Sequence, residues 1–160
     1  MMADIATRVA HLGFVLPALP SPRGAYLGAV AHDGIVYVSG QVSRIGDEVI
    51  TGPVDRDTPD DVIRNAARAC VLRALSVLVG TVAPTASVER ILFLRGFINS
   101  TPDFRHHSRV MDAVSTLLHD IFGESGQCAR SAIGVASLPD GGLLEIELTV
   151  ALTPEPRLRL

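Results

Sequence analysis

The stretch Gln127-Cys-Ala-Arg-Ser-Ala-Ile-Gly-Val-Ala-Ser-Leu-Pro139, followed by Gly141-Gly-Leu-Leu-Glu-Ile-Glu-Leu-Thr-Val150, decides how the chain folds. It predicts two β-strands joined by a tight turn, because the residues from Pro139 to Gly142 are all turn formers. Apolar residues dominate both predicted strands. We therefore expect the two strands to complete a sheet that the rest of the chain supports.

The same stretch holds the best candidate for a chemical site. Arg130 stands near the start of the first predicted strand, and Glu145 and Glu147 project from one face of the second because they are two residues apart. An arginine can hold a carboxylate through two parallel hydrogen bonds, and a glutamate can act as a general base. A structural interpretation stays open: Arg130 pairs with a local acid, for example Glu145 or Glu124, and the two glutamates form the solvated face of a strand.

Composition limits the class of protein. A chain of 160 residues suits one domain with a substantial core. No apolar run approaches the roughly 20 residues that span a bilayer, and residues 1–13 lack the apolar centre of a signal peptide. The spacing of Cys70 and Cys128 suggests neither a disulfide framework nor a zinc site. We expect a cytoplasmic protein that does not associate with membranes.

The charge pattern argues against nucleic acid as a binding partner. The net charge is −3 and the arginines are scattered along the sequence, whereas binding to phosphates needs a basic patch. The histidines, among them His106, His107 and His119, lack the spacing of metal ligands, so we expect no metal site. The serines lack a nucleophile-elbow motif and the glycines form no phosphate loop.

The chain divides into three predicted parts. Residues 1–22 predict an N-terminal helical segment followed by a proline-rich arm, because proline excludes regular structure over residues 16–22. Residues 23–152 form the main domain. Residues 153–160, with two prolines, predict a loose tail.

The first half of the main domain predicts a hairpin and a helix. Asp33-Gly34 separates two apolar runs and favours a tight turn between strands at residues 25–31 and 35–39. A short strand is expected at residues 48–51. Thr58-Pro-Asp-Asp61 predicts a helix start capped by the Thr58 hydroxyl, and Gly80 predicts its end.

The second half repeats this logic. Residues 88–98 predict a strand with Ile91, Phe93 and Phe97 on one face. Thr101-Pro102-Asp103 predicts the capped start of a second helix that ends at Gly123. The order ββ(β)αβαββ predicts an α+β fold with two helices packed on one face of a sheet. The other face is apolar in part, and we expect self-association, most simply as a ring of subunits, to cover it.

Four motifs in register resemble the RidA/YjgF family, also called the L-PSP endoribonuclease or enamine/imine deaminase family. They span most of the chain and are Gly24-Ala-Tyr26, Tyr37-Val-Ser-Gly-Gln41, Phe97-Ile-Asn-Ser-Thr-Pro-Asp-Phe104 and Ala129-Arg-Ser131 through Leu138-Pro139 to Glu145-Ile-Glu147. The resemblance implies a chorismate-mutase-like fold and a homotrimer with clefts between subunits. It implies hydrolysis of 2-imino or enamine acids to 2-oxo acids and ammonia without a metal or organic cofactor.

The resemblance also implies roles for individual residues. Arg130 binds the substrate carboxylate, Glu145 positions the attacking water, and Tyr26 closes the cleft. The remaining expected substrate-binding residues are Ser39, Gly40, Ser131, Ala132 and Asp112.

Some features depart from the family pattern. Asp112 replaces the family's usual asparagine, Ala132 replaces a frequent cysteine, and the arm at residues 1–22 is longer than in typical members, as in a longer branch. These departures leave the substrate open. Two alternatives to the deaminase remain: a non-catalytic trimer that binds a carboxylate metabolite, and an endoribonuclease or translation inhibitor, which the acidic net charge disfavours.

Overall fold

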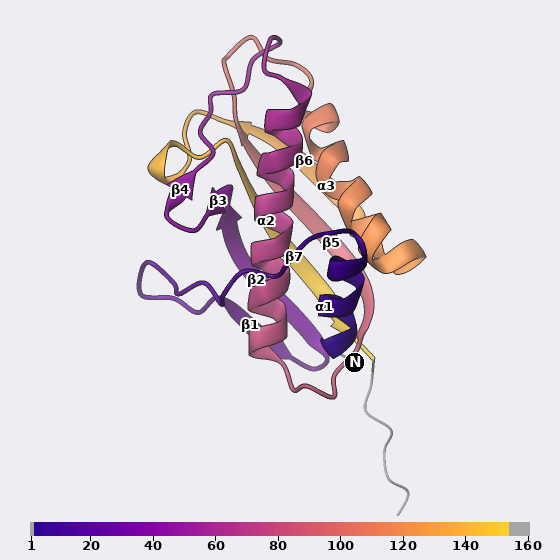
Figure 1. Ribbon diagram of the computed structural model, residues 1–160. Helices are drawn as coiled ribbons and strands as arrows, with labels where there is room; N and C mark the ends of the chain where they lie inside the picture. Colours follow the sequence, from indigo (N-terminus) through magenta and orange to yellow (C-terminus); the bar gives the residue numbers. More distant parts are fainter. Residues whose placement is uncertain (1, 154–160) are drawn as a thin grey trace, which may run out of the picture.

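The fold is taken from a computed structural model that describes residues 2–153 (Figure 1). In chain order the helices and strands are α1 (Met2–His11), β1 (Ala29–His32), β2 (Ile35–Val42), β3 (Arg44–Ile45), β4 (Glu48–Val49), α2 (Asp60–Thr81), β5 (Val88–Asn99), α3 (His107–Phe122), β6 (Ala129–Val135) and β7 (Leu144–Leu152). Short 3-10 turns at Gly123–Gly126 and Pro139–Gly141 precede β6 and β7. No helix in residues 2–153 is long and apolar enough to cross a membrane.

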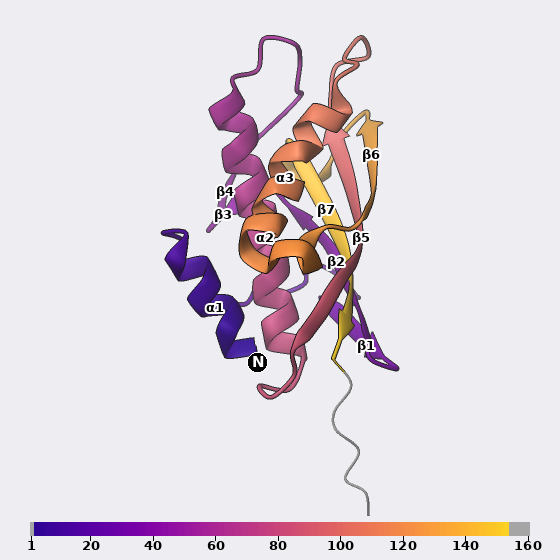
Figure 2. The same ribbon diagram turned by 90° about the vertical axis from the view of Figure 1, so that its right-hand side faces the viewer.

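The molecule has two layers. Five strands form a sheet in the order β1-β2-β7-β5-β6, and β3 and β4 form a separate small ribbon. Figure 2 shows all three helices on one side of this sheet and none on the other. The predicted α+β class, with helices on one face, is confirmed. The helix α1 lies where the sequence predicts an N-terminal helical segment; its Ile5 and Val9 are buried, and its Arg8 donates a hydrogen bond to the Ile121 carbonyl at 3.2 Å.

The central strand β7 separates the two faces of the sheet by strict alternation. Leu144, Ile146, Leu148 and Val150 are at most 1% exposed and pack under the helices. Burying each such side chain stabilises the fold by roughly 1.5–3 kcal/mol. The intervening residues, Glu145 among them, point to the face that no helix covers. This alternation fixes where the acidic groups lie.

The prediction that β6 and β7 pair as a hairpin is wrong. β6 runs parallel to β5 at the sheet edge, while β7 lies between β2 and β5 and is antiparallel to both. The turn formers at residues 139–142 do reverse the chain. Turn chemistry does not specify which strand receives the hydrogen bonds, however, and the long strand β7 is bonded on both sides.

Both helices begin later than predicted. The Thr58 hydroxyl does not cap α2: it accepts a hydrogen bond from the Asp55 N–H at 3.0 Å and donates to the Asp55 carboxylate at 2.9 Å. The helix starts at Asp60, after Pro59, without a side-chain cap. Likewise α3 starts at His107, because Thr101 to Asp103 forms a turn. Threonine, proline and aspartate favour turns as well as helix starts.

Two further positions differ from the prediction for related reasons. An irregularity between Ile91 and Phe93 in the pairing of β5 with β7 changes the side-chain alternation. Ile91 is therefore buried while Phe93 and Phe97 lie on the uncovered face. Gly80 lies inside α2 and does not end it. A Cβ at Gly80 would stand 2.8 Å from the Leu19 side chain, so this glycine allows the N-terminal arm to approach the helix.

The predicted hairpin is confirmed. Asp33 and Gly34 connect β1 to β2 with φ values of 48° and 77°. The arm crosses α2, where the Ser76 hydroxyl donates to the Pro17 carbonyl at 2.8 Å and the Arg68 guanidinium lies 5.0 Å from the Phe14 ring centroid. The predicted tail falls almost wholly on residues 154–160, outside the described residues.

Candidate functional site

Arg130 and Glu145 lie on opposite faces of the sheet. In the strand register Arg130 is opposite Leu94, and Leu94 is opposite Leu148, so Arg130 shares the helix-covered face with these buried leucines. Glu145 is three residues from Leu148 and points to the other face. The strand β5 also separates the two strands that carry them. One copy of the chain therefore does not bring the two predicted site residues together.

Glu145 lies in a pocket of about 260 Å³, here called the Glu145 pocket. β1 pairs with β2 only at residues 35–38, so the second half of β2 forms the sheet edge beside this pocket. The lining comes from the arm and the loop after it, β2, β3, α2, the turn before β7, and β7 itself: Pro20, Ser21, Pro22, Arg23, Tyr26, Gly28, Gly40, Gln41, Val42, Arg44, Arg73, Pro139, Asp140 and Glu145. Elements distant in sequence thus build one small concave site.

The carboxylate of Glu145 rests directly against Gly40. A Cβ at position 40 would stand 2.9 Å from Cδ of Glu145 and still closer to Oε1. Glu145 is half-buried, and this burial, followed by the negative charge of Glu147, raises the pKa of the Glu145 carboxyl above its ordinary value. A carboxylate with a raised pKa and restricted surroundings suits a group that accepts a proton from water.

Tyr26 and Ser39 have different positions relative to this pocket. Tyr26 lines it and is 51% exposed, and its hydroxyl accepts a hydrogen bond from the Arg23 N–H at 3.4 Å. Ser39 does not line the pocket. Its hydroxyl donates to the Leu27 carbonyl at 2.7 Å, which fastens the loop carrying Tyr26 to β2. Ser39 therefore shapes the pocket wall in this chain.

Arg130 is held by α3. One of its nitrogens donates to the Asp112 carboxylate at 2.9 Å and to the Ser115 hydroxyl at 3.0 Å, and the other donates to the Ser108 hydroxyl at 3.1 Å. The structural interpretation, in which Arg130 pairs with a local acid, agrees with this contact, and the acid is Asp112 instead of Glu145 or Glu124. Sequence reasoning did not single out Ser108 or Ser115, although both stand on the α3 face that bears Asp112, at four-residue and three-residue spacing.

The other expected site residues lie near Arg130 in the sheet. Ser131 is opposite Arg95 on the uncovered face, and Ala132 is opposite Gly96 on the helix-covered face. Neither lines the Glu145 pocket. The expected residues thus form two groups within one chain, one around Glu145 and one around Arg130.

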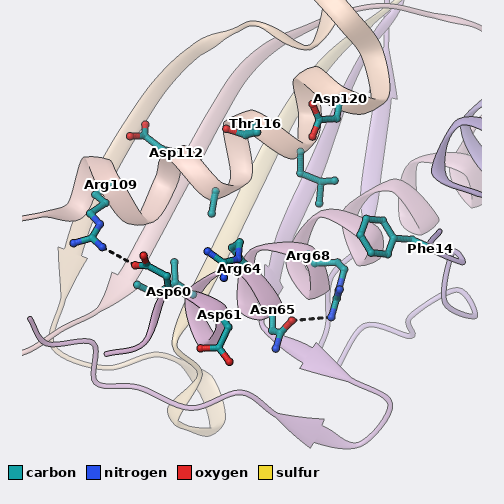
Figure 3. Close-up of a pocket in the computed structure, with 13 residues that line it drawn as sticks. Phe14, Asp60, Asp61, Arg64, Asn65, Arg68, Arg109, Asp112, Thr116 and Asp120 are labelled. Atoms are coloured by element: carbon teal, nitrogen blue, oxygen red, sulfur yellow. Dashed lines mark hydrogen bonds and ion pairs between the residues drawn. The ribbon is translucent and has the colours of Figure 1, made fainter. Parts of the chain in front are cut away.

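Asp112 also borders a larger groove between α2 and α3, of about 490 Å³ (Figure 3). Two of its arginines have partners: Arg109 pairs with Asp60 at 2.6 Å, and Arg68 donates to Asn65 at 2.8 Å. Neither Arg130 nor Glu145 lines this groove. The larger groove therefore contains neither of the two residues predicted to be catalytic.

Three arginines line the Glu145 pocket that the sequence analysis did not predict as site residues: Arg23, Arg44 and Arg73. Arg73 belongs to α2, where its neighbours Val71 and Ala74 are fully buried, and Arg73 itself is partly buried. The sequence signal for it is an arginine within the largely apolar run from Val71 to Leu78.

Sequence comparisons find related proteins over most of the chain. A protein-family model described as "Endoribonuclease L-PSP" matches residues 17–152. Protein TCP17 of Trypanosoma cruzi is 34% identical over 151 residues, covering 92% of this chain and 94% of that protein. A 2-iminobutanoate/2-iminopropanoate deaminase of Dermatophagoides farinae is 30% identical over 139 residues, covering 85% and 92%.

The fold has a solved counterpart of similar length. The crystal structure of the protein Atu1372 from Agrobacterium tumefaciens, described as of unknown function, superposes with a TM-score of 0.83 at 30% identity and covers 96% of both chains. Because the superposition covers 96% of this chain, the similarity extends into its N-terminal part.

Proposed function

Since the chain belongs to the endoribonuclease L-PSP family, we propose that it is a RidA-like hydrolytic deaminase. Its substrates in this proposal are 2-imino or enamine acids such as 2-aminoacrylate and 2-iminobutanoate, and its products are 2-oxo acids and ammonia. One of the relatives bears the name of a 2-iminobutanoate/2-iminopropanoate deaminase. The reaction needs a water-activating group and an anchor for a carboxylate, and both residue types are present.

The observation that carries the proposal is the setting of Glu145. The carboxyl lies half-buried against Gly40 in a pocket of about 260 Å³, and burial and Glu147 raise its pKa. A base whose pKa is raised toward neutrality accepts protons more effectively than an ordinary glutamate. Tyr26, at the pocket rim, is placed to cover a bound ligand.

The substrate anchor in this proposal is Arg130 of a second copy. Arg130 and Glu145 are on opposite faces of one sheet, so a shared site requires that the edge strand β6 of one copy approach the Glu145 pocket of another. The uncovered sheet face carries exposed apolar side chains, among them Tyr37 and Ile133 at 55% and 40% exposure. Self-association as a homotrimer covers this face and joins the two half-sites.

The chemistry follows from these positions. Arg130 binds the carboxylate and fixes the imine carbon near Glu145. Glu145 takes a proton from water as the oxygen bonds to the imine carbon, and the C=N π electrons move to nitrogen. The resulting aminoalcohol receives the proton on nitrogen. The hydroxyl proton is then transferred to this nitrogen, and ammonia leaves as the oxygen forms the 2-oxo group, so that one water is consumed for each ammonia released.

The decisive experiment follows the decay of 2-aminoacrylate made by a serine dehydratase, with and without the protein. We expect faster decay with the wild type, and loss of the acceleration with Arg130→Ala and with Glu145→Ala. Light scattering on all three proteins checks assembly. Correctly assembled wild type that accelerates the decay of neither 2-aminoacrylate nor 2-iminobutanoate would disprove the deaminase.

Non-catalytic binding of a carboxylate metabolite is the second candidate. It uses the same anchor, Arg130, whose hydrogen bonds to Asp112, Ser115 and Ser108 reduce the gain from a new ligand equally in both candidates. Glu145→Ala separates the two functions. A binder retains ligand affinity and has no turnover to lose, whereas an enzyme loses turnover and retains affinity. Endoribonuclease activity, which the family description names, is disfavoured by the net charge of −3.

A further inference from the structure

Three guanidinium groups converge on the Glu145 pocket. Arg23 comes from the loop before β1, Arg44 from β3 and Arg73 from α2. Like charges held together in a partly desolvated site repel one another unless anions neutralise them. The question is which groups supply that neutralisation.

One carboxylate serves two of the three arginines. Asp140 Oδ2 forms an ion pair with Arg44 and a second ion pair, at 3.5 Å, with Arg23. Arg44 is only 7% exposed and also donates to the Asp47 carbonyl at 3.3 Å. Asp140 therefore compensates Arg44 and has little capacity left for a third cation.

Arg73 has no such partner. Its Nε is buried and makes no hydrogen bond, and residues 2–153 provide no ion pair to its guanidinium. Burial, and then the charge of Arg44, hold the pKa of Arg73 below its ordinary value. An arginine nevertheless stays protonated in proteins. A buried and unpaired donor is costly, and such costs concentrate at functional sites.

Glu145 does not compensate Arg73 either. The pKa of Glu145 is raised by burial and by Glu147, with no arginine lowering it. The groove of Figure 3 provides a contrast, because Arg109 and Arg68 have partners there and Arg64 is exposed to solvent. Unneutralised positive charge is thus a property of the Glu145 pocket.

We infer that the substrate carries a second carboxylate at the end of its side chain, which binds Arg73 with the help of Arg44 and Arg23. The substrate class is a 2-imino acid derived from a dicarboxylic amino acid. The inference rests on the proposed function, in which Arg130 of a second copy takes the first carboxylate. A pocket of about 260 Å³ is smaller than the roughly 300–1,000 Å³ that hold drug-sized ligands, and it suits an acid of four or five carbons.

The test compares 2-iminoglutarate with 2-iminobutanoate, each made in place by an amino-acid oxidase and followed by released ammonia. We expect kcat/KM to be at least about tenfold higher for the dicarboxylate, as a charge-assisted hydrogen bond provides. Arg73→Gln is expected to reduce this preference about tenfold, and Arg73→Lys to keep part of it. Arg64→Gln is the matched control, because Arg64 is exposed on the same helix and lines the other groove.

A second measurement separates this inference from the proposed function. Calorimetric titration with 2-oxoglutarate and 2-oxobutanoate measures the anion site without catalysis. Tighter binding of 2-oxoglutarate that Arg73→Gln abolishes supports the inference even if no imino acid is turned over, in which case only the deaminase fails. Equal affinity for the two oxo acids, or an equal effect of Arg73→Gln on both ligands, overturns the inference whatever the turnover.

Discussion

Gly40 leaves the space that the Glu145 carboxylate occupies. A Cβ at position 40 would stand 2.9 Å from Cδ of Glu145 and 3.3 Å from Cγ, inside van der Waals contact. Gly40 has no positive φ, so its backbone does not require glycine. The requirement comes from the neighbouring side chain, and it links a residue of the β2 edge to the chemistry proposed for β7.

Gly40→Ala is expected to lower kcat by roughly 10- to 100-fold, less than the roughly 10²- to 10⁴-fold that a positioned general base contributes, because the base is displaced and not removed. The methyl group must push the Glu145 carboxylate out of its position. Steady-state kinetics measure the loss. In a Glu145→Ala background the same substitution removes no further activity and costs little free energy of unfolding, because the clashing atoms are gone. Full activity of the single variant Gly40→Ala would show that the carboxylate position is immaterial.

The acid limb of the pH–rate profile should report Glu145. The group accepts a proton only when ionised, so kcat/KM falls as pH drops through its raised pKa. Glu147→Gln removes a negative charge that raises this pKa, and therefore moves the limb to lower pH. Arg95→Gln makes the opposite shift, because Arg95 pairs with Glu147 at 2.7 Å and attenuates its field. The pH–rate profiles of the wild type and the two variants show the order of the three acid limbs. An acid limb that stays at the same pH in both variants would belong to a group other than Glu145.

The same group should oppose folding at neutral pH. The pKa of Glu145 is raised above its ordinary value of 4.5 in the fold, so the folded state binds this proton more tightly than the unfolded state. The protonated Glu145 carboxyl therefore stabilises the folded state. This contribution is complete at pH values below the pKa of the unfolded state and is lost as pH rises through the pKa of the folded state. Glu145→Gln is therefore expected to be at least as stable as wild type at pH 7, with the difference vanishing near pH 4. Urea unfolding at one protein concentration measures this, and a marked loss at pH 7 would contradict it.

The fold was largely predictable because its signals are local and periodic. The alternation of β7 and the apolar stripes of α2 and α3 indicate one sheet face under two helices. The order of strands was not predictable in the same way, since β6 and β7 are adjacent in sequence and bonded to different neighbours. Pairing depends on long-range register, which a turn sequence does not specify.

The sequence predicts which residue types belong to the candidate site, but not how the fold arranges them in space. Arg130 and Glu145 stand out as charges within apolar strands, but parity along two separate strands places them on opposite faces. Arg73 did not stand out, because a helical arginine usually extends its apolar stem and reaches water. Its lack of a partner follows from the packing of the arm, α2 and β3 around it, which no local pattern encodes.

Asp112→Asn should strengthen the binding of anionic ligands. Asp112 neutralises Arg130 through a contact of 2.9 Å, and the amide keeps an acceptor oxygen while losing the charge. We expect Kd for 2-oxobutanoate to fall by about two- to tenfold, with little change in stability, since pairs this exposed contribute roughly 0–1 kcal/mol. Calorimetric titration gives Kd. The control Asp120→Asn alters a carboxylate of the same helix that does not contact Arg130, and equal effects of both changes would indicate a general charge effect.

Two inactive variants should restore each other's activity. If each site takes Glu145 from one copy and Arg130 from the next, Arg130→Ala chains still offer Glu145 and Glu145→Ala chains still offer Arg130. Random reassembly of an equal mixture then creates intact sites at about one quarter of the positions in a cyclic trimer. Each variant is inactive alone, and mixing them without unfolding and refolding provides the control. An equal mixture that stays inactive after confirmed reassembly would place both residues of each site in the same chain, which the opposite faces of the sheet argue against.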